Sequence, residues 1–441
     1  MSSEKIFALV DCNNFYASCE KIFQPDLNDK PVVILSNNDG CIIARSNEAK
    51  DLKIPMGVAY HQYRRMMEQN HVKAFSSNYT LYGDISSRVM QSLAMMAPEM
   101  EVYSIDEAFL RITEAENGDL IKFCADVRNN IQRWIGIPTS IGIAPTKTLA
   151  KMANVLAKKQ GRKLIKKFSD NYNFTCAQDH VFDLRDERLR KKILGEFDLK
   201  EIWGISQASS SKLNRIGIYT ALDLCNSDSR QVRNVLGVVG ERIVYELRGI
   251  SCLGLQDISP RKSIMSSRSF GRKVTKKEEL IEAISSYATR AHEKLKHQKS
   301  IAQAIHVYIR TNHFSINDAQ YQNGITKSFV RATDSLSDII KTACEAIDEI
   351  YQPNFNYKKA GIILLDLVSR NQVQENLLIL DDAEKRGKLE KLENAMSLVN
   401  QNLGRNTIFY AALGTKRNWA MQSNNRSPSY TTNVKEIPLV S

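Results

Sequence analysis

The sequence predicts an α+β protein built from several domains. Its 441 residues exceed the length that one hydrophobic core usually covers and are enough for about three or four domains. Short apolar runs typical of buried strands alternate with segments of helical period along most of the chain. Between residues 267 and 367 the predicted order is strand, helix, strand, strand, helix, strand, which is the pattern of an α+β domain.

The composition favours a nucleic acid as partner. Lysine and arginine outnumber aspartate and glutamate by 61 to 49, and such a surplus attracts polyanions, nucleic acid ahead of membranes. A basic enzyme without such a partner is the alternative. No apolar run is long enough to span a bilayer and no signal-peptide pattern is present, so we expect a cytoplasmic protein with no membrane partner. The eight cysteines form no C-x-x-C pair, which favours reduced thiols.

The first element is a buried strand, Ile6 to Val10, that ends in Asp11. Asn13 or Asn14 can then cap a helix that runs through Glu20. An aspartate at the carboxyl end of a core strand is a favoured position for a ligand or catalytic group. The alternative is a simple cap residue.

Residues 25–75 are predicted to form a small insertion. Two strands, Val32–Leu35 and Cys41–Ala44, flank S-N-N-D-G, which the Asp-Gly rule makes a hairpin. A helix from Asn47 to Leu52 follows and ends before Pro55.

An acidic pair, Asp106-Glu107, lies between two short apolar runs within V-Y-S-I-D-E-A-F-L-R-I. The pattern predicts two strands with a tight turn between them. At a turn both carboxylates can reach one point, where they would repel each other unless a cation lay between them, and hard oxygen ligands suit Mg²⁺. Taken alone, an acidic dipeptide on a turn is more often a solvated corner.

An amphipathic helix, Tyr82 to Ala97, precedes this hairpin, and a second helix, Leu120 to Ile135, follows it. A strand from Thr139 to Ala144 then leads into the helix K-T-L-A-K-M-A-N-V-L-A-K-K. Three lysines four and seven residues apart share one side of it: Lys147, Lys151 and Lys158. Helix lysines usually form a solvated face, but this helix begins beside the sheet edge that carries the acids, which favours contact with phosphate.

Residues 165–182 are polar and irregular and predict a domain boundary. The next segment, Asp186 to Gly249, is helical by its period. Glycine turns at Gly204 and Gly217 resemble a helix-hairpin-helix, in which backbone N–H groups hold a DNA phosphate. A plain helical bundle is the alternative.

The α+β domain of the last third follows a stretch of turn and linker residues, Gly249 to Ser267. It carries a basic cluster that consists of Arg268, Arg272, Lys273, Lys276 and Lys277. Positive charge without interleaved aromatics suits contact with the DNA backbone more than base readout. From about 368 the chain is polar, with a charged helix at Ala383 to Val399.

Three blocks stand in the order and spacing of a known enzyme family: F-A-L-V-D-C-N-N-F-Y-A-S-C-E, Y-S-I-D-E-A-F and I-G-I-A-P-T-K-T-L-A-K-M-A. Together they resemble the Y-family translesion DNA polymerases, and the resemblance covers nearly the whole chain. S-N-N-D-G-C-I-I-A-R, R-S-F-G-R and the late S-P-S-Y-T-T are similar to the bacterial members that cause mutagenesis in the SOS response.

This resemblance implies a right-hand polymerase. Its expected parts are a palm at 1–25 and 75–168, small fingers at 26–74, a helical thumb at 180–249, a linker at 250–266, an α+β little-finger DNA-binding domain at 267–367 and a C-terminal tail at 368–441. The implied activity is error-prone, template-directed addition of deoxynucleotides to a primer 3′-hydroxyl past damaged bases, in DNA repair.

The resemblance also implies the catalytic centre. Asp11, Asp106 and Glu107 match the family's carboxylate ligands, and the main-chain carbonyl of Cys12 is a further ligand. They would bind two Mg²⁺ ions for phosphoryl transfer, one acting on the primer hydroxyl and one on the triphosphate.

Tyr16, with Phe15 beside it, matches the steric gate, a ring that would clash with a ribose 2′-hydroxyl and so select deoxynucleotides. Ordinary core aromatics at the strand–helix junction are the alternative. Ile43 and Ala44 would lie over the nascent base pair, and the roomy pocket that small residues and short fingers imply would tolerate damaged templates at low fidelity.

Three further residues are implied to bind the nucleotide. Lys158 matches the palm lysine that meets the triphosphate. Lys50 stands where several relatives carry an arginine and Asn47 where they carry a tyrosine, so the charge is kept but the bidentate fork and the phenol donor are absent.

The tail is expected to bind a sliding clamp. Relatives carry a Gln-x-x-Leu-Phe peptide after the little finger, and Gln374, Leu377 and Leu378 lie at the matching place. A plain linker with two leucines is the alternative. The remaining implied partners are a primed, damaged DNA template, deoxynucleoside triphosphates, a UmuD-type accessory dimer and a RecA filament.

Two functions of other classes are open to the same fold. A nucleotide cyclase can carry paired acids on a palm-like sheet, but it needs no thumb, basic little finger or gate tyrosine. A catalytically dead scaffold at the replication fork should have lost metal ligands, and all three carboxylates are present in this sequence.

Overall fold

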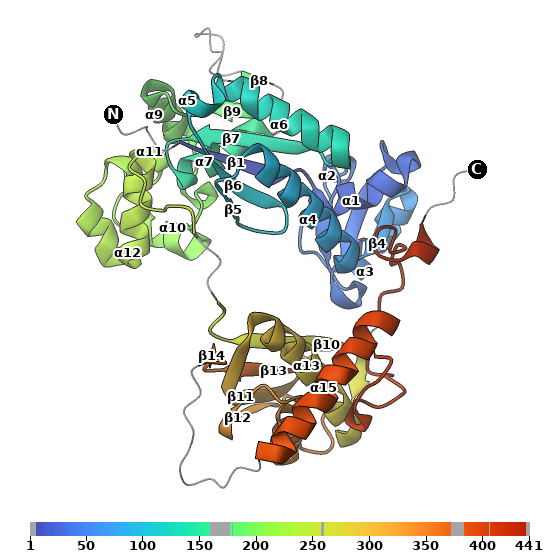
Figure 1. The fold of residues 1–441 in the computed structure, drawn as a ribbon. Coiled ribbons are helices and arrows are strands. Elements are labelled where there is room, and N and C mark those ends of the chain that lie inside the picture. Colours follow the sequence, from blue (N-terminus) through green and yellow to red (C-terminus); the bar gives the residue numbers. More distant parts are fainter. Residues whose placement is uncertain are drawn as a thin grey trace. The chain divides into compact units, whose positions relative to one another are not determined.

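The computed structural model of the chain describes residues 6–158, 177–178, 180–256, 260–371, 383–404 and 406–437. Figure 1 shows its helices and strands. The chain divides into two compact units. The first contains Met1–Leu35, Cys41–Asp257 and Asn425–Ser441, and the second contains Ser36–Gly40 and Ile258–Asn424. In the described ranges no helix combines the length and the apolar character that crossing a membrane requires.

The first unit is built on a six-stranded sheet of order β5-β6-β1-β7-β9-β8. The strands are β1 (Ile6–Cys12), β5 (Met100–Val102), β6 (Glu107–Ile112), β7 (Thr139–Ala144), β8 (Ala177–Gln178) and β9 (Val181–Asp183). The central strand β1 pairs antiparallel with β6 and with β7. Because β9 pairs in parallel with β7, the boundary predicted at 165–182 is wrong at its C-terminal end. A strand of three residues beside polar sequence is too short to show a recognisable hydrophobic period.

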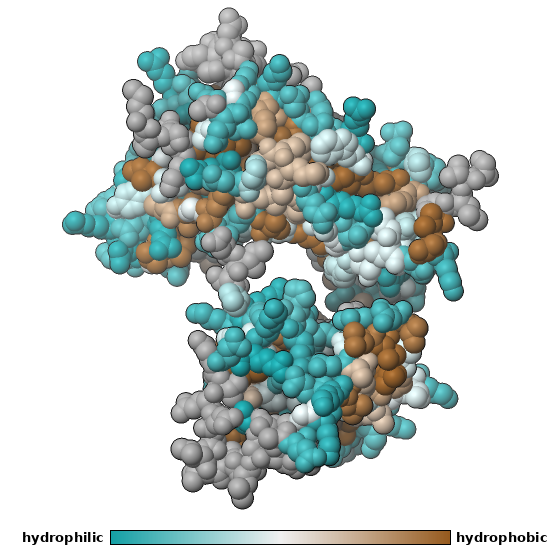
Figure 2. Space-filling view, viewed as in Figure 1, coloured by the Kyte–Doolittle hydropathy of each residue, from teal (hydrophilic) through white to brown (hydrophobic). Residues whose placement is uncertain are grey.

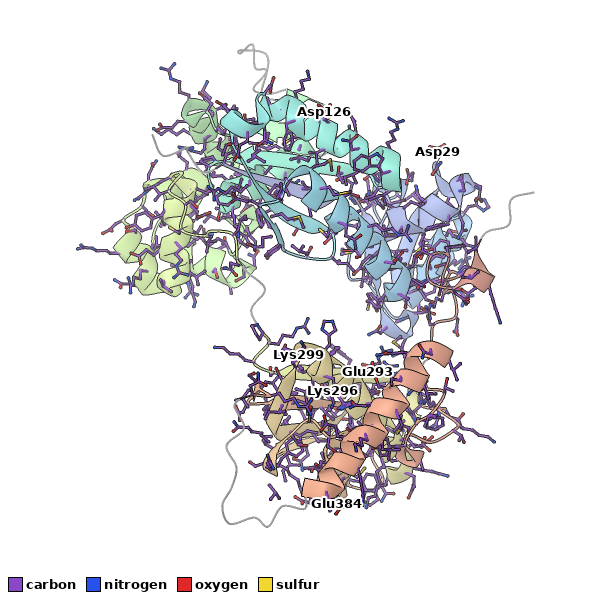
Figure 3. The ribbon with its side chains drawn as sticks, viewed as in Figure 1. Asp29, Asp126, Glu293, Lys296, Lys299 and Glu384 are labelled. Carbon is purple, nitrogen blue, oxygen red and sulfur yellow. The ribbon has the colours of Figure 1, made fainter. Side chains whose placement is uncertain are left out.

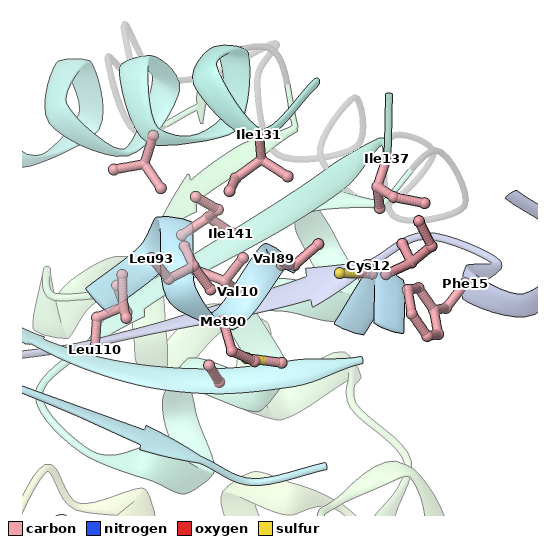
Figure 4. Close-up of a cluster of buried hydrophobic side chains, with 14 of the residues drawn as sticks. Val10, Cys12, Phe15, Val89, Met90, Leu93, Leu110, Ile131, Ile137 and Ile141 are labelled. Atoms are coloured by element: carbon pink, nitrogen blue, oxygen red, sulfur yellow. The ribbon is translucent and has the colours of Figure 1, made fainter. Parts of the chain in front are cut away.

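Helices cover both faces of this sheet. The first face packs against α1 (Phe15–Phe23), α4 (Tyr79–Met96) and α6 (Leu120–Ile135). Figure 4 shows Val10 and Ile141 of the sheet packed with Leu93 and Ile131 of these helices. The opposite face packs against α7 (Lys147–Ala157) and against helices that follow it in the chain. The strand predicted at Ile6 to Val10 is therefore buried on both faces, as its continuous apolar run indicates.

Gly142 allows α7 to lie unusually close to the sheet. A Cβ atom at this position of β7 would come within 2.2 Å of the backbone nitrogen of Asn154 on α7. The buried amide of Asn154 uses this proximity and donates to the carbonyl oxygens of Ser140 at 2.7 Å and of Leu9 at 3.3 Å. The close approach therefore fixes α7 across β1 and β7.

A second, smaller sheet in the first unit has the order β3-β2-β4. Its strands are β2 (Val32–Leu35), β3 (Ile42–Arg45) and β4 (Lys73–Ser76), accompanied by α2 (Asn47–Asp51) and α3 (Tyr60–Gln69). The predicted hairpin forms, but the left-handed residues are Asn38 and Asp39, with φ of 61° and 50°, while Gly40 has φ of −80°. The Asp-Gly rule therefore placed the turn one residue late. The sequence pattern also gave no indication of α3 and β4.

Among the described residues, the first unit also contains α9 (Glu187–Glu196), α10 (Gln207–Asn214), α11 (Ala221–Asn226) and α12 (Ser229–Leu247). They share a hydrophobic core with α7 and the sheet. Gly204 and Gly217, on either side of α10, both have positive φ, 91° and 81°, which explains the need for glycine there. Shorter helical turns of this unit are α5 (Glu114–Asn117), η1 (Pro25–Leu27), η4 (Leu199–Glu201) and η6 (Val434–Glu436). Two others, η2 (Asn37–Asp39) and η5 (Ala411–Leu413), belong to the second unit.

The second unit has the element order that the sequence predicts. Its sheet has the order β10-β13-β11-β12, and β14 pairs with β11. The elements are β10 (Ile264–Val274), α13 (Lys277–Gln298), β11 (Ser300–Thr311), β12 (Gln322–Thr333), α14 (Leu336–Ile350), β13 (Tyr357–Leu365) and β14 (Val368–Ser369). The core of the unit lies between this sheet and the apolar sides of α13 and α14.

The predicted charged helix near the C-terminus is α15 (Ala383–Leu403). Its Glu393 accepts the backbone N–H of Leu336 at 2.8 Å, so α15 supplies a carboxylate to the positive end of α14. The C-terminal half of α15 exposes Leu398 and Leu403, and Figure 2 shows hydrophobic side chains gathered on this part of the unit. Figure 3 shows Lys296 near the C-terminal end of α13, where it pairs with Asp334.

Candidate active site

Two of the predicted carboxylates are neighbours on adjacent strands of the large sheet. Asp11 on β1 is paired in register with Glu107, the first residue of β6. Because side chains alternate along a strand, Asp11 shares its face with Leu9 and Glu107 with Phe109, and both apolar residues pack on the α7 side. The two carboxylates therefore project toward α7, side by side.

Asp106 joins this pair from the turn between β5 and β6. Its main-chain oxygen accepts the N–H of Cys12 at 2.8 Å, and its carboxylate accepts the hydroxyl of Ser104 at 2.5 Å. Burial raises the pKa of the Cys12 thiol, and the charges of Asp11, Asp106 and Glu107 raise it further. The charges of all three carboxylates thus act on one buried thiol, and the strand register and the Cys12–Asp106 hydrogen bond place them at the same corner of the sheet.

The lysines of α7 face these acids. Lys158 lies 2.7 Å from Asp11 and Lys151 lies 2.8 Å from Glu107, both measured from Nζ to a carboxylate oxygen. Lys147 is 2% exposed and pairs with Glu101 of β5 at 2.5 Å. The three lysines do gather on the side that faces the sheet, as predicted, although α7 ends at Ala157 and Lys158 follows it. They do not form a solvated face, because each has an acidic partner in the sheet.

The electrostatics of Asp11 reflect this setting. Burial raises the pKa of its carboxyl to about 6, Lys158 opposes that rise, and the neighbouring Glu107 adds to it. Nearby, burial lowers the pKa of Lys50, and the positive charges of Arg45 and Lys158 lower it further. Cations from the small sheet and from α7 thus gather beside the acids, as expected where a polyphosphate binds.

The site fits divalent cations by its donor set. In the described part of the chain, no three side chains of the metal-binding types are gathered closely enough to form a ready metal site. Lys158, Lys151 and Ser104 each hold an oxygen of one of the three acids. The donors are nevertheless hard oxygens at one corner of the sheet, and the mutual repulsion of Asp11 and Glu107 is what a bound cation would relieve.

Tyr16 lies on α1, just past the acidic strand. Its ring stacks on that of Tyr82 with centroids 4.5 Å apart and meets Tyr79 edge-on at 6.0 Å. Phe15 is 3% exposed and belongs to the core. Of the two predicted gate residues, Tyr16 therefore has the ring that remains partly accessible, while Phe15 supports the helix from beneath.

The predicted nucleotide contacts from the small sheet lie close to this corner. The amide of Asn14 donates to Asn47 at 3.0 Å, which links the start of α1 to the start of α2. Asn14 thus precedes α1 without capping it through its side chain, unlike the predicted cap. Ile43 and Ala44 follow one another on β3 and pack at the edge of the core under α1.

Several residues of this corner carry no signal in the sequence. Arg45 and Ser104 stand beside predicted site residues but have no pattern of their own. Lys151 lies over the rings of Tyr103 and Trp203, 4.3 Å and 5.5 Å from their centroids. The indole of Trp203 donates to the hydroxyl of Tyr103 at 3.1 Å, so the helical segment contacts the acidic hairpin through this cation–π cluster.

The predicted DNA contacts in the second unit differ in their charge balance. Arg272 pairs with Glu279, and Lys273 pairs with Asp318 at 2.7 Å. Among the described residues, Arg268 and Lys276 have no carboxylate within ion-pair distance. The predicted clamp peptide, with Gln374, Leu377 and Leu378, lies outside the described residues.

Comparisons with known proteins agree with this geometry. A solved chimera built on the Y-family DNA polymerase Dbh has a TM-score of 0.65, is 19% identical and covers 82% of this chain and 99% of its own. The fold is that of a Y-family DNA polymerase, a right hand with palm, fingers, thumb and little finger.

The chain belongs to the impB/mucB/samB family, whose models match residues 10–155 and, for the C-terminal domain, 261–377. It is 40% identical to Protein UmuC of Salmonella typhimurium over 98% of this chain and 99% of that one, and 36% identical to Protein MucB of Escherichia coli over the same shares. Residues 390–440 match a domain of unknown function. The chain is an error-prone translesion DNA polymerase of the SOS response.

Proposed function

We propose that this polymerase extends primed, damaged DNA by two-metal phosphoryl transfer at the corner formed by Asp11, Asp106 and Glu107. The observation that carries the proposal is the pairing of Asp11 with Glu107 on adjacent strands, with Asp106 on the turn beside them. Polymerases of this family generally need divalent metal ions. We propose two Mg²⁺ ions, held by the three carboxylates and the main-chain carbonyl of Cys12.

The bound ions would supply a lowered pKa at the primer 3′-hydroxyl and charge neutralisation on the triphosphate. The protein's own side chains orient the acids and balance their charge. Ser104 fixes the orientation of Asp106 through its 2.5 Å hydrogen bond. Lys158 and Lys151 balance the charge of the acids, and the ammonium group of Lys158 could exchange its ion pair with Asp11 for one with a triphosphate oxygen.

Nucleotide selection is assigned to the corner of α1 and the fingers. Tyr16 would lie against the sugar C2′ position and exclude a ribose hydroxyl. Lys50 and Asn47 would contact the triphosphate. Burial, with the positive charges of Arg45 and Lys158, lowers the pKa of Lys50, and an anionic ligand would oppose this effect. Ile43 and Ala44 would lie over the nascent base pair and leave room for a damaged template base.

DNA is proposed to lie on the thumb and little finger. Gly204 and Gly217 would let backbone N–H groups approach phosphates, and Arg268, with Lys276, would supply unbalanced positive charge. Arg272 and Lys273 are proposed to contribute less to DNA binding, since each already has a carboxylate partner. Proposed further partners are a UmuD-type dimer, a RecA filament and, through Gln374, Leu377 and Leu378, a sliding clamp.

A primer-extension assay with Mg²⁺ on a primed template tests the proposal. The full chain should add deoxynucleotides, whereas Asp106→Ala should not. Glu99→Gln is the matched control, because Glu99 is an exposed acid at the edge of the same sheet that pairs only with Arg111 among the described residues. Cyclisation of a free nucleoside triphosphate, or DNA binding without any extension by the intact chain, would favour the cyclase or the scaffold instead.

A further inference from the structure

A late segment of the chain, from Asn425 onward, belongs to the first unit and packs at the edge of its small sheet. Asn425 and Ser76, the last residue of β4, exchange two hydrogen bonds: the N–H of Ser76 donates to the oxygen of Asn425 at 3.0 Å, and the N–H of Asn425 donates to the Ser76 hydroxyl at 2.9 Å. Arg426 forms a parallel bridge with Ser76. Residues 425–430, called the strap below, thus continue from the edge of the small sheet and lie within the stretch that matches a domain of unknown function.

Two anchors hold the strap against the palm helices. The buried amide of Asn78, which caps α4, donates to the hydroxyl of Ser427 at 3.0 Å and to its carbonyl oxygen at 3.1 Å. At the other end, the ring of Tyr430 stacks on Phe23 with centroids 4.6 Å apart, and Gln24 donates to its hydroxyl at 3.0 Å. The strap therefore spans the start of α4 and the end of α1.

Between these anchors, a chain of interactions leads from the strap to Tyr16. The hydroxyl of Ser427 donates to Oε1 of Glu20 at 3.0 Å. The hydroxyl of Tyr82 donates to the same oxygen at 2.6 Å. The ring of Tyr82 stacks on Tyr16, with 17° between the ring planes. Ser427 and Tyr16 are thus joined through two intervening side chains.

Glu20 makes this chain of interactions sensitive to the strap. The residue is fully buried, and among the described residues its second oxygen, Oε2, has no hydrogen-bond partner. Burial raises the pKa of its carboxyl, and the hydrogen bonds from Tyr82 and Ser427 oppose the rise. A buried carboxyl with so few donors is poorly satisfied, so removing one donor changes how it holds the other.

We propose that Ser427 is a positioning residue for sugar selection. The docked strap fixes Glu20, Glu20 fixes the hydroxyl of Tyr82, and the stacked ring of Tyr82 holds the Tyr16 ring in one orientation. The inference rests on the proposed role of Tyr16 as the gate. It gives the end of the chain, far from Tyr16 in sequence, a direct part in excluding ribonucleotides.

The test compares the full chain with variants that cut single links. Ser427→Ala removes the hydroxyl that Glu20 accepts, and Tyr82→Phe removes the other hydroxyl while keeping the stacked ring. Ser427→Thr restores a hydroxyl. Ser429→Ala is the matched control, since the Ser429 hydroxyl accepts a bond from Arg426 at 3.4 Å instead. The readout is the ratio of kcat/KM for a deoxynucleotide to that for the matching ribonucleotide on primed DNA.

Ser427→Ala and Tyr82→Phe should each lower this ratio by roughly 3- to 10-fold, mainly by raising ribonucleotide addition. The double variant should lower it no more than either single one, because both act through Glu20. Ser427→Thr and Ser429→Ala should stay within about twofold of the parent. Hydrogen exchange at the first amides of α4 should speed up in Ser427→Ala and not in Ser429→Ala, whether or not the enzyme is catalytically active.

Additive effects in the double variant, an unchanged ratio in Ser427→Ala, or equal exchange in Ser427→Ala and Ser429→Ala would each overturn the inference. Tyr16→Ala, assayed in parallel, distinguishes a failure of the gate assignment from a failure of the role proposed for the strap. If Tyr16→Ala keeps full sugar discrimination, the gate assignment itself fails. If Tyr16→Ala abolishes discrimination and Ser427→Ala does not change it, only the role of the strap is refuted.

Discussion

Lys158 and Asp11 lie 2.7 Å apart, from the ammonium nitrogen of one to a carboxylate oxygen of the other. A second ion pair of the same kind lies beside it, with Nζ of Lys151 2.8 Å from a carboxylate oxygen of Glu107. Like charges on adjacent strands are destabilising, and in this site the cations of α7 offset that repulsion. The acids are therefore held close together by lysines that can also serve the nucleotide.

The first prediction separates chemistry from DNA binding. Asp11→Asn and Asp106→Ala should abolish nucleotide addition, because each removes a carboxylate from the proposed metal corner. Affinity for primed DNA should stay within a few-fold, since DNA binding is assigned to the thumb and little finger. Primer extension and fluorescence anisotropy measure the two properties. Extension at a near-parental rate by either variant would exclude the two-metal assignment.

The second prediction concerns the gate. Tyr16→Ala should admit ribonucleotides and lower the discrimination between the two sugars by about 10- to 200-fold, the range for one group in a fitted pocket. Deoxynucleotide addition should be partly retained, because the change removes a clash and costs local stacking on Tyr82. Single-nucleotide insertion kinetics with both sugars measure this. Unchanged discrimination would make Tyr16 a packing residue.

These assignments show where prediction from sequence stops. The order of elements in the second unit is readable because its strands and helices are long and periodic. The direction in which the Asp11 side chain points cannot be read from the sequence, because I-F-A-L-V-D-C is buried on both faces and shows no alternation of apolar and polar residues. Its pairing with Glu107 depends on the register between two strands almost a hundred residues apart.

Other features escape prediction because their cause is distant or their signal is short. The burial of Lys147 depends on Glu101 across the sheet, and nothing in the helix itself distinguishes it from a surface lysine. β9 has three residues, too few for a period. The hydrogen bonds of Ser427 reach back across most of the chain to Asn78 and Glu20, and no local pattern indicates them.

The third prediction is a pH dependence of stability in the second unit. His292 on α13 is buried, and burial lowers its pKa from the ordinary value of 6.5 to about 4. The unfolded chain then binds a proton that the folded unit does not bind, so this residue destabilises the fold as the pH falls from 6.5 toward 4, by up to about 3 kcal/mol. Chemical denaturation at about pH 7 and about pH 5 should show a smaller decrease in the free energy of unfolding for His292→Gln than for the parent. An equal decrease in both would assign the acid sensitivity to other groups.

The fourth prediction grades the basic residues of the little finger. Replacing Arg268 and Lys276 with Ala should weaken DNA binding for all sequences alike and make the slope of log K against log salt shallower, by about 0.9 for each phosphate that is no longer neutralised. Replacing Arg272 and Lys273, which already pair with Glu279 and Asp318, should change the slope less. Salt titrations of duplex binding compare the two double variants. Equal slopes in the parent and both variants would place the DNA elsewhere.

The last prediction concerns the proposed clamp peptide, Gln374-Glu375-Asn376-Leu377-Leu378. Such a peptide docks with its glutamine in one subsite and two large apolar groups in another. Leu378 stands where relatives have an aromatic ring, and Glu375 brings a charge where an apolar residue is common. Together these changes should weaken docking by about 1–3 kcal/mol relative to a full motif.

We therefore expect measurable but weak clamp binding, which leaves a UmuD-type dimer and a RecA filament to help hold the enzyme at the primer. Titration of a peptide of residues 370–382 into the cognate clamp by calorimetry measures the affinity. Leu378→Phe should strengthen it, because the ring fills more of the apolar subsite. A peptide with Gln374→Ala and Leu377→Ala is the control. Binding of the parent peptide no tighter than this control would show that the segment is a linker and that the enzyme is held at the primer by other means.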